Sequence, residues 1–193
     1  AKRALPNAAA LIRSRVPMQV TATPENVALD ENLLRDVSVL WIHGREAFEL
    51  TPLQRSSLRM YIQRGGFVLA NSICASDAFA ESFRREMQLV LLESPLQSMA
   101  TEHPAWTTAF GGFDVTRVTL RTHERGGDGQ DIRKQEAPPQ FEFAIVDEFS
   151  SVFFSPLDLS CALESQNSIQ CAGYSTDEAV KIVANLLLYA LQQ

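Results

Sequence analysis

Apolar residues recur along this chain as short runs that end abruptly in polar residues. Three runs show the pattern most clearly, those at 37–42, 67–70 and 152–154. Each is too short for a helix and is rich in β-branched, aromatic or other apolar residues, which predicts a buried strand. The polar segments that follow begin at His43, Asn71 and Ser155. Because parallel strands of an open α/β sheet gather their carboxyl ends at one edge, we expect these segments to meet there.

Helix start and stop signals flank the middle run. Pro52 is tolerated in the first turn of a helix, and Gly65-Gly66 ends that helix. After the strand, Ser76 or Asp77 begins another helix. This alternation of helix and strand with short connections is typical of a parallel sheet covered by helices on both faces.

Further elements are expected on both sides of this unit. Helical spacing predicts helices at 5–12, 104–110 and 175–191. Apolar runs or alternation predict strands at 16–21, 89–92, 115–121, 141–145 and 151–155. The polar segment 122–140, with its glycines and prolines, is expected to form a mobile loop.

Together these elements predict one α/β domain over residues 1–193. We expect a three-layer α/β/α sandwich with a mostly parallel sheet and a late antiparallel hairpin between residues 115 and 155. The chain has 193 residues, of which 46% are hydrophobic and 21% charged, and this suits one globular domain with a sizeable core.

Charge and hydropathy narrow the function classes. The formal net charge is −6, whereas nucleic-acid binding needs clustered Lys and Arg, so we expect no nucleic-acid partner. No apolar run reaches the roughly 18 residues of a membrane span. The chain begins with Ala1 rather than Met, and we therefore expect either a removed leader or a fragment of a longer protein.

The cysteines are too few for a disulfide framework. The chain has three, Cys74, Cys161 and Cys171. Cys161 and Cys171 flank a polar loop, and their spacing fits either one bridge in an oxidising compartment or two buried thiols.

Cys74 is also a candidate nucleophile. It lies just before a predicted helix, whose dipole favours the thiolate. A nucleophilic cysteine needs a base that a third group orients. His43 would be the base, and Glu46 or Asp158 would orient it. No G-x-C-x-G elbow surrounds Cys74, so the interpretation of Cys74 as a small apolar filler is favoured.

Other polar residues at the strand ends are candidates for binding. Asn71 and Ser72 offer neutral hydrogen-bonding groups, which suit sugars, amides or the loop's own backbone. Asp158 and Ser160 are two residues apart and would face the same way in extended geometry. Asp158 could hold a ligand hydroxyl or cap a helix. The candidate ligand-binding residues are His43, Asn71, Ser72, Cys74, Asp77, His103, Asp158 and Ser160.

A metal site has little support from the spacing. His43, His103 and Asp158 have the composition of a two-histidine, one-carboxylate site. However, no short-range histidine pair is present. We therefore expect no metal and no cofactor.

Many of these residues belong to an ordered set that resembles a known family. The set comprises His43-Gly44, Phe48, 61–67, Cys74, Phe79, 82–86, His103-Pro104, 155–161 and Gly173-Tyr174. From about Leu5 to Leu191, it resembles the bacterial domain-of-unknown-function family numbered four-one-five-nine. The chain departs from that family in lacking a strand before the first helix, and in having Ile42 where the family tends to have Gly before His-Gly.

The resemblance implies a fold and a location. It implies a class I glutamine amidotransferase-like fold, which is flavodoxin-like, with room for a nucleophile in the loop that holds Cys74. It also implies a periplasmic or cell-envelope location, sometimes as the soluble end of a larger membrane protein.

We therefore expect a non-catalytic ligand- or partner-binding domain of the bacterial cell envelope. Its partner would be an unknown small molecule, a glycan or an envelope protein. The alternative is a cysteine hydrolase or amidotransferase-like enzyme with Cys74 as nucleophile. A third interpretation is a structural module attached to a membrane-embedded partner or an upstream segment, which an exposed apolar patch far from the polar edge would favour.

Overall fold

The computed structural model describes residues 3–17, 19, 21–22, 26–123, 132–164 and 171–192. Its helices are α1 (Ala4–Arg15), α2 (Pro52–Gln63), α3 (Asp77–Leu91), α4 (Ser160–Leu163) and α5 (Thr176–Ala190). Its strands are β1 (Val39–Gly44), β2 (Phe67–Ser72), β3 (Gln97–Ser98), β4 (Val118–His123), β5 (Ile132–Ala137), β6 (Glu142–Val146), β7 (Phe149–Ser155) and β8 (Gly173–Tyr174). Short 3₁₀ turns are η1 (Ile73–Ala75), η2 (Pro104–Trp106) and η3 (Thr108–Phe110).

The strands form two sheets. The larger has the order β1-β2-β7-β6-β3, in which β1, β2 and β7 are parallel neighbours. β6 is antiparallel to β7, and β3 is antiparallel to β6. The smaller sheet, β5-β4-β8, is antiparallel. A mixed α/β fold with parallel strands is therefore confirmed, and the antiparallel pair β4–β5 belongs, together with β8, to the second sheet.

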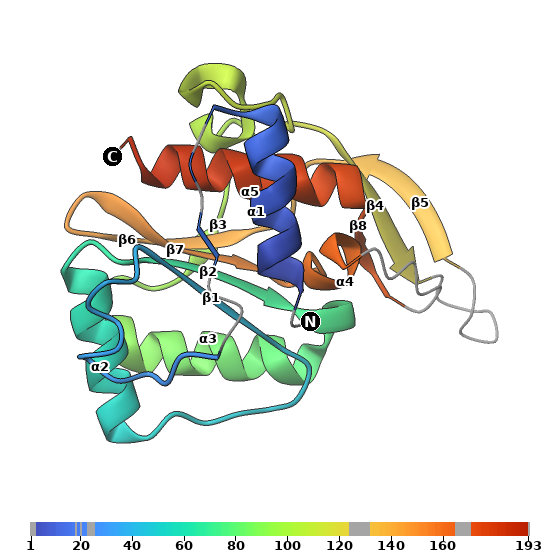
Figure 1. Ribbon diagram of the computed structural model, residues 1–193. Coiled ribbons are helices and arrows are strands. Elements are labelled where there is room, and N and C mark those ends of the chain that lie inside the picture. Colours follow the sequence, from blue (N-terminus) through green and yellow to red (C-terminus); the bar gives the residue numbers. More distant parts are fainter. Residues whose placement is uncertain are drawn as a thin grey trace.

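Helices cover both faces of the larger sheet (Figure 1). On one face, α1 and α5 pack on residues such as Leu69 and Phe153. On the other face, α2 and α3 pack on residues such as Val68 and Phe154. Because consecutive side chains of a strand point to opposite faces, all six residues of β2 are buried.

Local signals set the helix boundaries as expected. Thr51 and Gln54 form a reciprocal capping box at the start of α2. Gly65 has a φ of +86°, which glycine adopts without strain, and the chain reverses there into β2. Ser76 and Ser175 cap α3 and α5 with their hydroxyl groups.

Two predicted strands are not observed in the residues that the structure describes. The strand expected at 89–92 is wrong, because α3 continues through Leu91 and the buried Val90 extends the apolar face that contains Met87. A run of four apolar residues does not distinguish a strand from the end of a helix. The described residues between 16 and 21 form no strand, while residues 18 and 20 lie outside the described part.

The segment expected to be a mobile loop contains a strand. Within 122–140, β5 pairs with β4, with Gln135 opposite Leu120. Residues 124–131 lie outside the described part of the chain. The described side chains of β5 are mostly exposed and polar, so the strand has no hydrophobic pattern by which it could have been recognised.

None of the helices in the described residues has both the length and the hydrophobicity to cross a bilayer.

Candidate functional site

The carboxyl ends of the three parallel strands meet at one edge of the larger sheet. In register, His43 of β1 lies beside Asn71 of β2, and Asn71 lies beside Ser155 of β7. The three apolar runs are therefore neighbours that point the same way, as the sequence predicted. The polar segments that follow them are brought together at this edge, which we call the polar edge.

A hydrogen-bond chain connects the polar edge to the core. The Asn71 Oδ1 atom accepts from Trp41 Nε1 at 2.8 Å and from Ser160 Oγ at 2.8 Å. His43 Nδ1 lies 2.7 Å from Ser160 Oγ. Because the Ser160 hydroxyl donates its proton to Asn71, His43 must donate from Nδ1 to Ser160. This arrangement places a proton on Nδ1, so in the neutral ring Nε2 is the acceptor.

Burial keeps His43 in this neutral form. Desolvation of its half-buried ring lowers the pKa of His43, and the nearby Asp158 opposes this effect without outweighing it. The ring therefore presents a neutral Nε2 atom near neutral pH. Such an atom can accept a hydrogen bond, take up a proton or coordinate a metal ion.

Asp158 connects two loops of the polar edge. Its carboxylate is fully buried and accepts hydrogen bonds from the backbone N–H of Cys74, and from that of Cys161 at 2.8 Å. We expected Asp158 and Ser160 to face the same way in extended geometry. Instead, α4 begins at Ser160 and the chain turns, so the two side chains bond to different partners.

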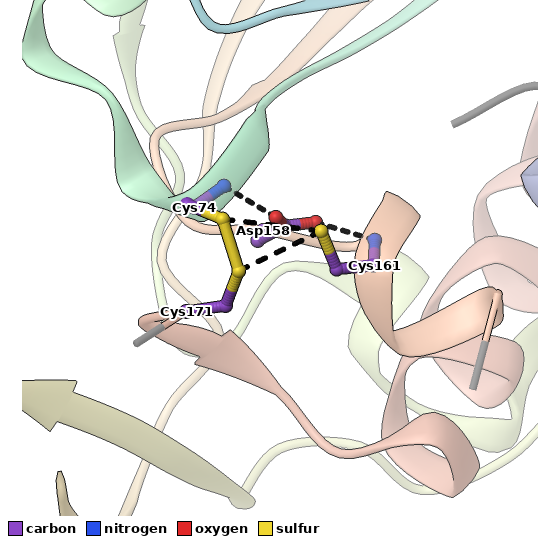
Figure 2. A group of neighbouring side chains, drawn as sticks. All are labelled: Cys74, Asp158, Cys161 and Cys171. Atoms are coloured by element: carbon purple, nitrogen blue, oxygen red, sulfur yellow. Dashed lines mark hydrogen bonds between the residues drawn. A yellow bond between two sulfur atoms is a disulfide. The ribbon is translucent and has the colours of Figure 1, made fainter. Parts of the chain in front are cut away.

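The cysteines are paired differently from either expectation. Cys74 and Cys171 form a disulfide, and Cys161 is free and buried (Figure 2). The Cys161 sulfur lies 3.6 Å from that of Cys171 and 4.0 Å from that of Cys74. Burial, together with the adjacent carboxylate of Asp158, raises the pKa of the Cys161 thiol to about 12. The thiol is therefore protonated at neutral pH.

Close backbone approach at Gly173 brings Cys171 to this cluster. Gly173 forms a parallel bridge with Asp158, and the Tyr174 N–H donates to the Asp158 carbonyl at 3.1 Å. A Cβ atom at Gly173 would clash with that same carbonyl oxygen and lie 2.9 Å from the Asp158 Cβ atom. Glycine is therefore required at this position for the two segments to pack together.

The substitution Gly173→Ala is expected to lower the free energy of unfolding by about 1–3 kcal/mol, because the added methyl group meets rigid backbone. Urea denaturation measures the loss. Gly44→Ala is the comparison variant, since its added methyl group meets a side chain, the ring of Phe79, and not the backbone. A smaller loss at Gly173 than at Gly44 would contradict this account of the packing.

Several candidate residues do not join the hydrogen-bonded group. Ser72 is buried next to Asn71 in β2, so its side chain points to the opposite face of the sheet. Asp77 lies exposed in the first turn of α3, and Glu46 is exposed in the loop after β1.

His103 lies away from the polar edge. Its ring packs against those of Phe143 and Tyr189, with centroids 5.3 Å away in each case. Its Nδ1 atom accepts from the Ala105 N–H at 3.2 Å, and burial lowers the pKa of His103. It therefore caps η2 and does not complete a site with His43 and Asp158.

Sequence reasoning missed three members of this region. Trp41 lies within the apolar run 37–42, which predicts a buried strand but not the hydrogen bond by which its indole N–H begins the chain. Cys161 and Cys171 were not connected to Cys74, because residues so far apart in sequence carry no spacing signal. The ordered family motif, which contains both Cys74 and Cys161, is the one signal that could have suggested their proximity.

A cavity of about 360 Å³ lies at the opposite, amino edge of the sheet. Its lining includes Val37 and Phe67, where the chain enters β1 and β2, and Leu191 after α5. None of the candidate site residues lines it. The cavity is therefore separate from the polar edge.

The sequence of this chain matches the model of one protein family. No curated protein matches this sequence. The model of the family described as Domain of unknown function (DUF4159) matches residues 1–191, almost the whole chain. The resemblance drawn from His43-Gly44, Cys74 and the 155–161 segment is thereby confirmed, and the chain belongs to the DUF4159 family.

Proposed function

We propose that this protein is a non-catalytic ligand- or partner-binding domain of the bacterial cell envelope, with its binding site at the polar edge. The observation that carries the proposal is the hydrogen-bond chain from Trp41 through Asn71 and Ser160 to His43. It holds the neutral His43 ring in one orientation, with Nε2 as an acceptor for a ligand donor. The buried Nδ2 atom of Asn71, which has no partner among the described residues, is a donor in the same region.

The chemistry of these groups favours a neutral polar ligand. The groups in the chain are an imidazole, a hydroxyl, an amide and an indole, none of which carries a charge in this arrangement. Hydroxyl and amide groups of a glycan or a peptide complement them. Asp158 is not available to such a ligand, because each of its two carboxylate oxygens already accepts a hydrogen bond from a backbone N–H group.

The disulfide supports the envelope location. Disulfides such as Cys74–Cys171 persist in oxidising compartments and are rare in the bacterial cytosol. The family resemblance implies the same location. Attachment to a membrane-embedded partner or an upstream segment is a further proposal. Phe149 and Leu191 are exposed and lie far from the polar edge, so they are the residues to substitute in testing it.

We also propose the finer fold class, a three-layer α/β/α sandwich related to class I glutamine amidotransferases. Support comes from the parallel strands β1, β2 and β7, and from helices on both faces of their sheet. Kinship of fold does not by itself imply the amidotransferase reaction.

The alternative, a cysteine hydrolase, requires a free Cys74 thiolate. In the oxidised protein, Cys74 is bonded to Cys171 and has no thiolate to offer. The nearest orienting partner of His43 is also a serine rather than the proposed Glu46 or Asp158. The binding function is therefore better supported than this alternative.

The binding proposal is tested by NMR of the oxidised, ¹⁵N-labelled protein with soluble sugar–peptide fragments of bacterial cell wall. We expect shifts at the backbone amides of Gly44, Ile73 and Ala75, which surround the polar edge. His43→Ala should weaken binding about tenfold, since one hydrogen bond of roughly 1.4 kcal/mol is lost.

The matched control for that experiment is His103→Ala, which removes a histidine away from the polar edge and should leave the affinity unchanged. If none of the fragments perturbs the amides of the polar edge, the assignment of a glycan or peptide ligand is wrong. Equal weakening by the two substitutions would exclude a specific role for His43.

A further inference from the structure

We propose that the reduced protein binds one Zn²⁺ ion through the sulfur atoms of Cys74, Cys161 and Cys171 and a carboxylate oxygen of Asp158. One potential ligand atom from each of these four residues lies within 4.8 Å of the other three. Figure 2 shows the four side chains converging on one point from three segments of the chain. Cys74 lies in η1, Asp158 and Cys161 lie just before and within α4, and Cys171 lies two residues before β8. This inference goes beyond the binding function proposed above.

The number and type of these groups suit zinc. Structural Zn²⁺ sites are almost always tetrahedral and use thiolate, imidazole or carboxylate ligands, with Zn–S near 2.3 Å and Zn–O near 2.1 Å. Ligand atoms around such an ion therefore stand about 3.5–4 Å apart. The Cys161 sulfur is already 3.6 Å and 4.0 Å from the other two sulfurs. Once the disulfide is reduced, the main adjustment required is separation of Cys74 from Cys171.

The local charge also favours a cation. Asp158 is fully buried, and no Lys or Arg in the described part of the chain forms an ion pair with it. A buried carboxylate is costly unless it is hydrogen-bonded and paired with a positive charge. Its hydrogen bonds come from the backbone N–H groups of Cys74 and Cys161, two of the other ligands. These bonds would hold the carboxylate in place, as outer-shell contacts do around metal ions.

The disulfide and the metal exclude one another. An external dithiol reduces the Cys74–Cys171 bond by supplying two electrons and two protons, and the dithiol is itself converted to a disulfide. Binding of Zn²⁺ then releases three thiol protons to solvent as three Zn–S bonds form. In the oxidised protein, two of the four ligands are bonded to each other, and no zinc is bound by this cluster.

The test uses the whole chain. It is reduced with dithiothreitol, which is then removed under anaerobic conditions. Titration of Zn²⁺ against a chromophoric chelator should give one bound ion per reduced chain and none per oxidised chain. Replacement by Co²⁺ should give strong thiolate-to-cobalt charge-transfer absorption and the visible bands of a tetrahedral site. A reduced parent protein that binds no stoichiometric zinc, or cobalt bound without sulfur charge transfer, would overturn the proposal.

Cys161→Ser is the most informative variant, because Cys161 is not part of the disulfide. It should retain the Cys74–Cys171 bond and the folded state in the oxidised form. In the reduced form it should bind zinc more than about 100-fold more weakly than the parent, since loss of an outer-shell partner alone costs 10–100-fold. Zinc affinity equal to that of the parent would show that the cluster is not the site.

Asp158→Asn and Asp114→Asn form a matched pair. The first removes the carboxylate of the cluster, while the second removes an exposed carboxylate that is bonded to Thr116. We expect weaker zinc binding in the first and the parent's affinity in the second. Equal affinities would mean that the carboxylate is not a ligand. Because ligand binding at the polar edge is measured on the oxidised protein, the two proposals fail independently.

Discussion

Replacement of both Cys74 and Cys171 by alanine is expected to lower the free energy of unfolding of the oxidised protein by about 4–5 kcal/mol. The bridge joins residues 97 positions apart. In the chain-entropy model, a cross-link that closes a loop of about 100 residues stabilises the folded state by roughly 4.7 kcal/mol, because it restricts the unfolded chain. Native proteins are stable by only about 5–15 kcal/mol, so this is a large fraction of the total.

Urea denaturation of the oxidised parent, the reduced parent and the double variant measures this effect. A chelator is included so that no metal stabilises the reduced chain. The reduced parent should resemble the double variant. Cys161→Ala is the control, since it removes a buried thiol without opening a cross-link, and it should cost about 1 kcal/mol. A double variant as stable as the oxidised parent would show that the bridge contributes nothing.

The second large effect is expected at Asn185, a polar residue buried in α5. Its Nδ2 atom donates to the carbonyls of Ala105 at 2.9 Å and Phe113 at 2.7 Å, and its Oδ1 atom accepts from the Phe113 N–H at 2.7 Å. These bonds hold the segment around η2 and η3 against the helix. Asn185→Leu keeps the side-chain size but leaves the buried Ala105 carbonyl and the half-buried backbone groups of Phe113 without this partner, which should cost about 3 kcal/mol.

The loss at Asn185 is measured by urea denaturation and by amide hydrogen exchange across 105–113, which should become faster. Gln192→Leu is the matched control. It removes a bond of 3.0 Å from an exposed amide to the Phe110 carbonyl, and it should cost less than about 0.5 kcal/mol. Stability of the Asn185→Leu protein close to that of the control would show that the amide does not hold this segment.

The candidate site was partly predictable from sequence. The ends of the runs at 37–42, 67–70 and 152–154 were expected to meet, and His43, Asn71 and Ser155 do lie side by side. The prediction succeeded because buried parallel strands have few ways to pair. It did not extend to Ser72 or His103, since the face on which a side chain lies depends on its position in the pleat and on the path of the loops.

The pairing of the cysteines was not predictable. Cys161 is ten positions from Cys171, whereas Cys74 is 97 positions away, yet Cys74 forms the bond. The bond follows from the parallel bridge of Asp158 with Gly173 and from the hydrogen bond of the Asp158 carboxylate to the Cys74 N–H. Both contacts join segments that are remote in the chain.

Helix caps, glycine turns and apolar runs act within a few residues, and for that reason the amino-acid order alone was enough to locate β1, β2, α2 and α5. Partners across tens of residues were settled by the folded arrangement instead. The tautomer of His43, the burial of Asp158 and the meeting of three sulfur atoms all require β1, β2, β7 and β8 to be in place. Such contacts depend on loop closure and close packing in three dimensions, and these leave no periodic trace in the chain.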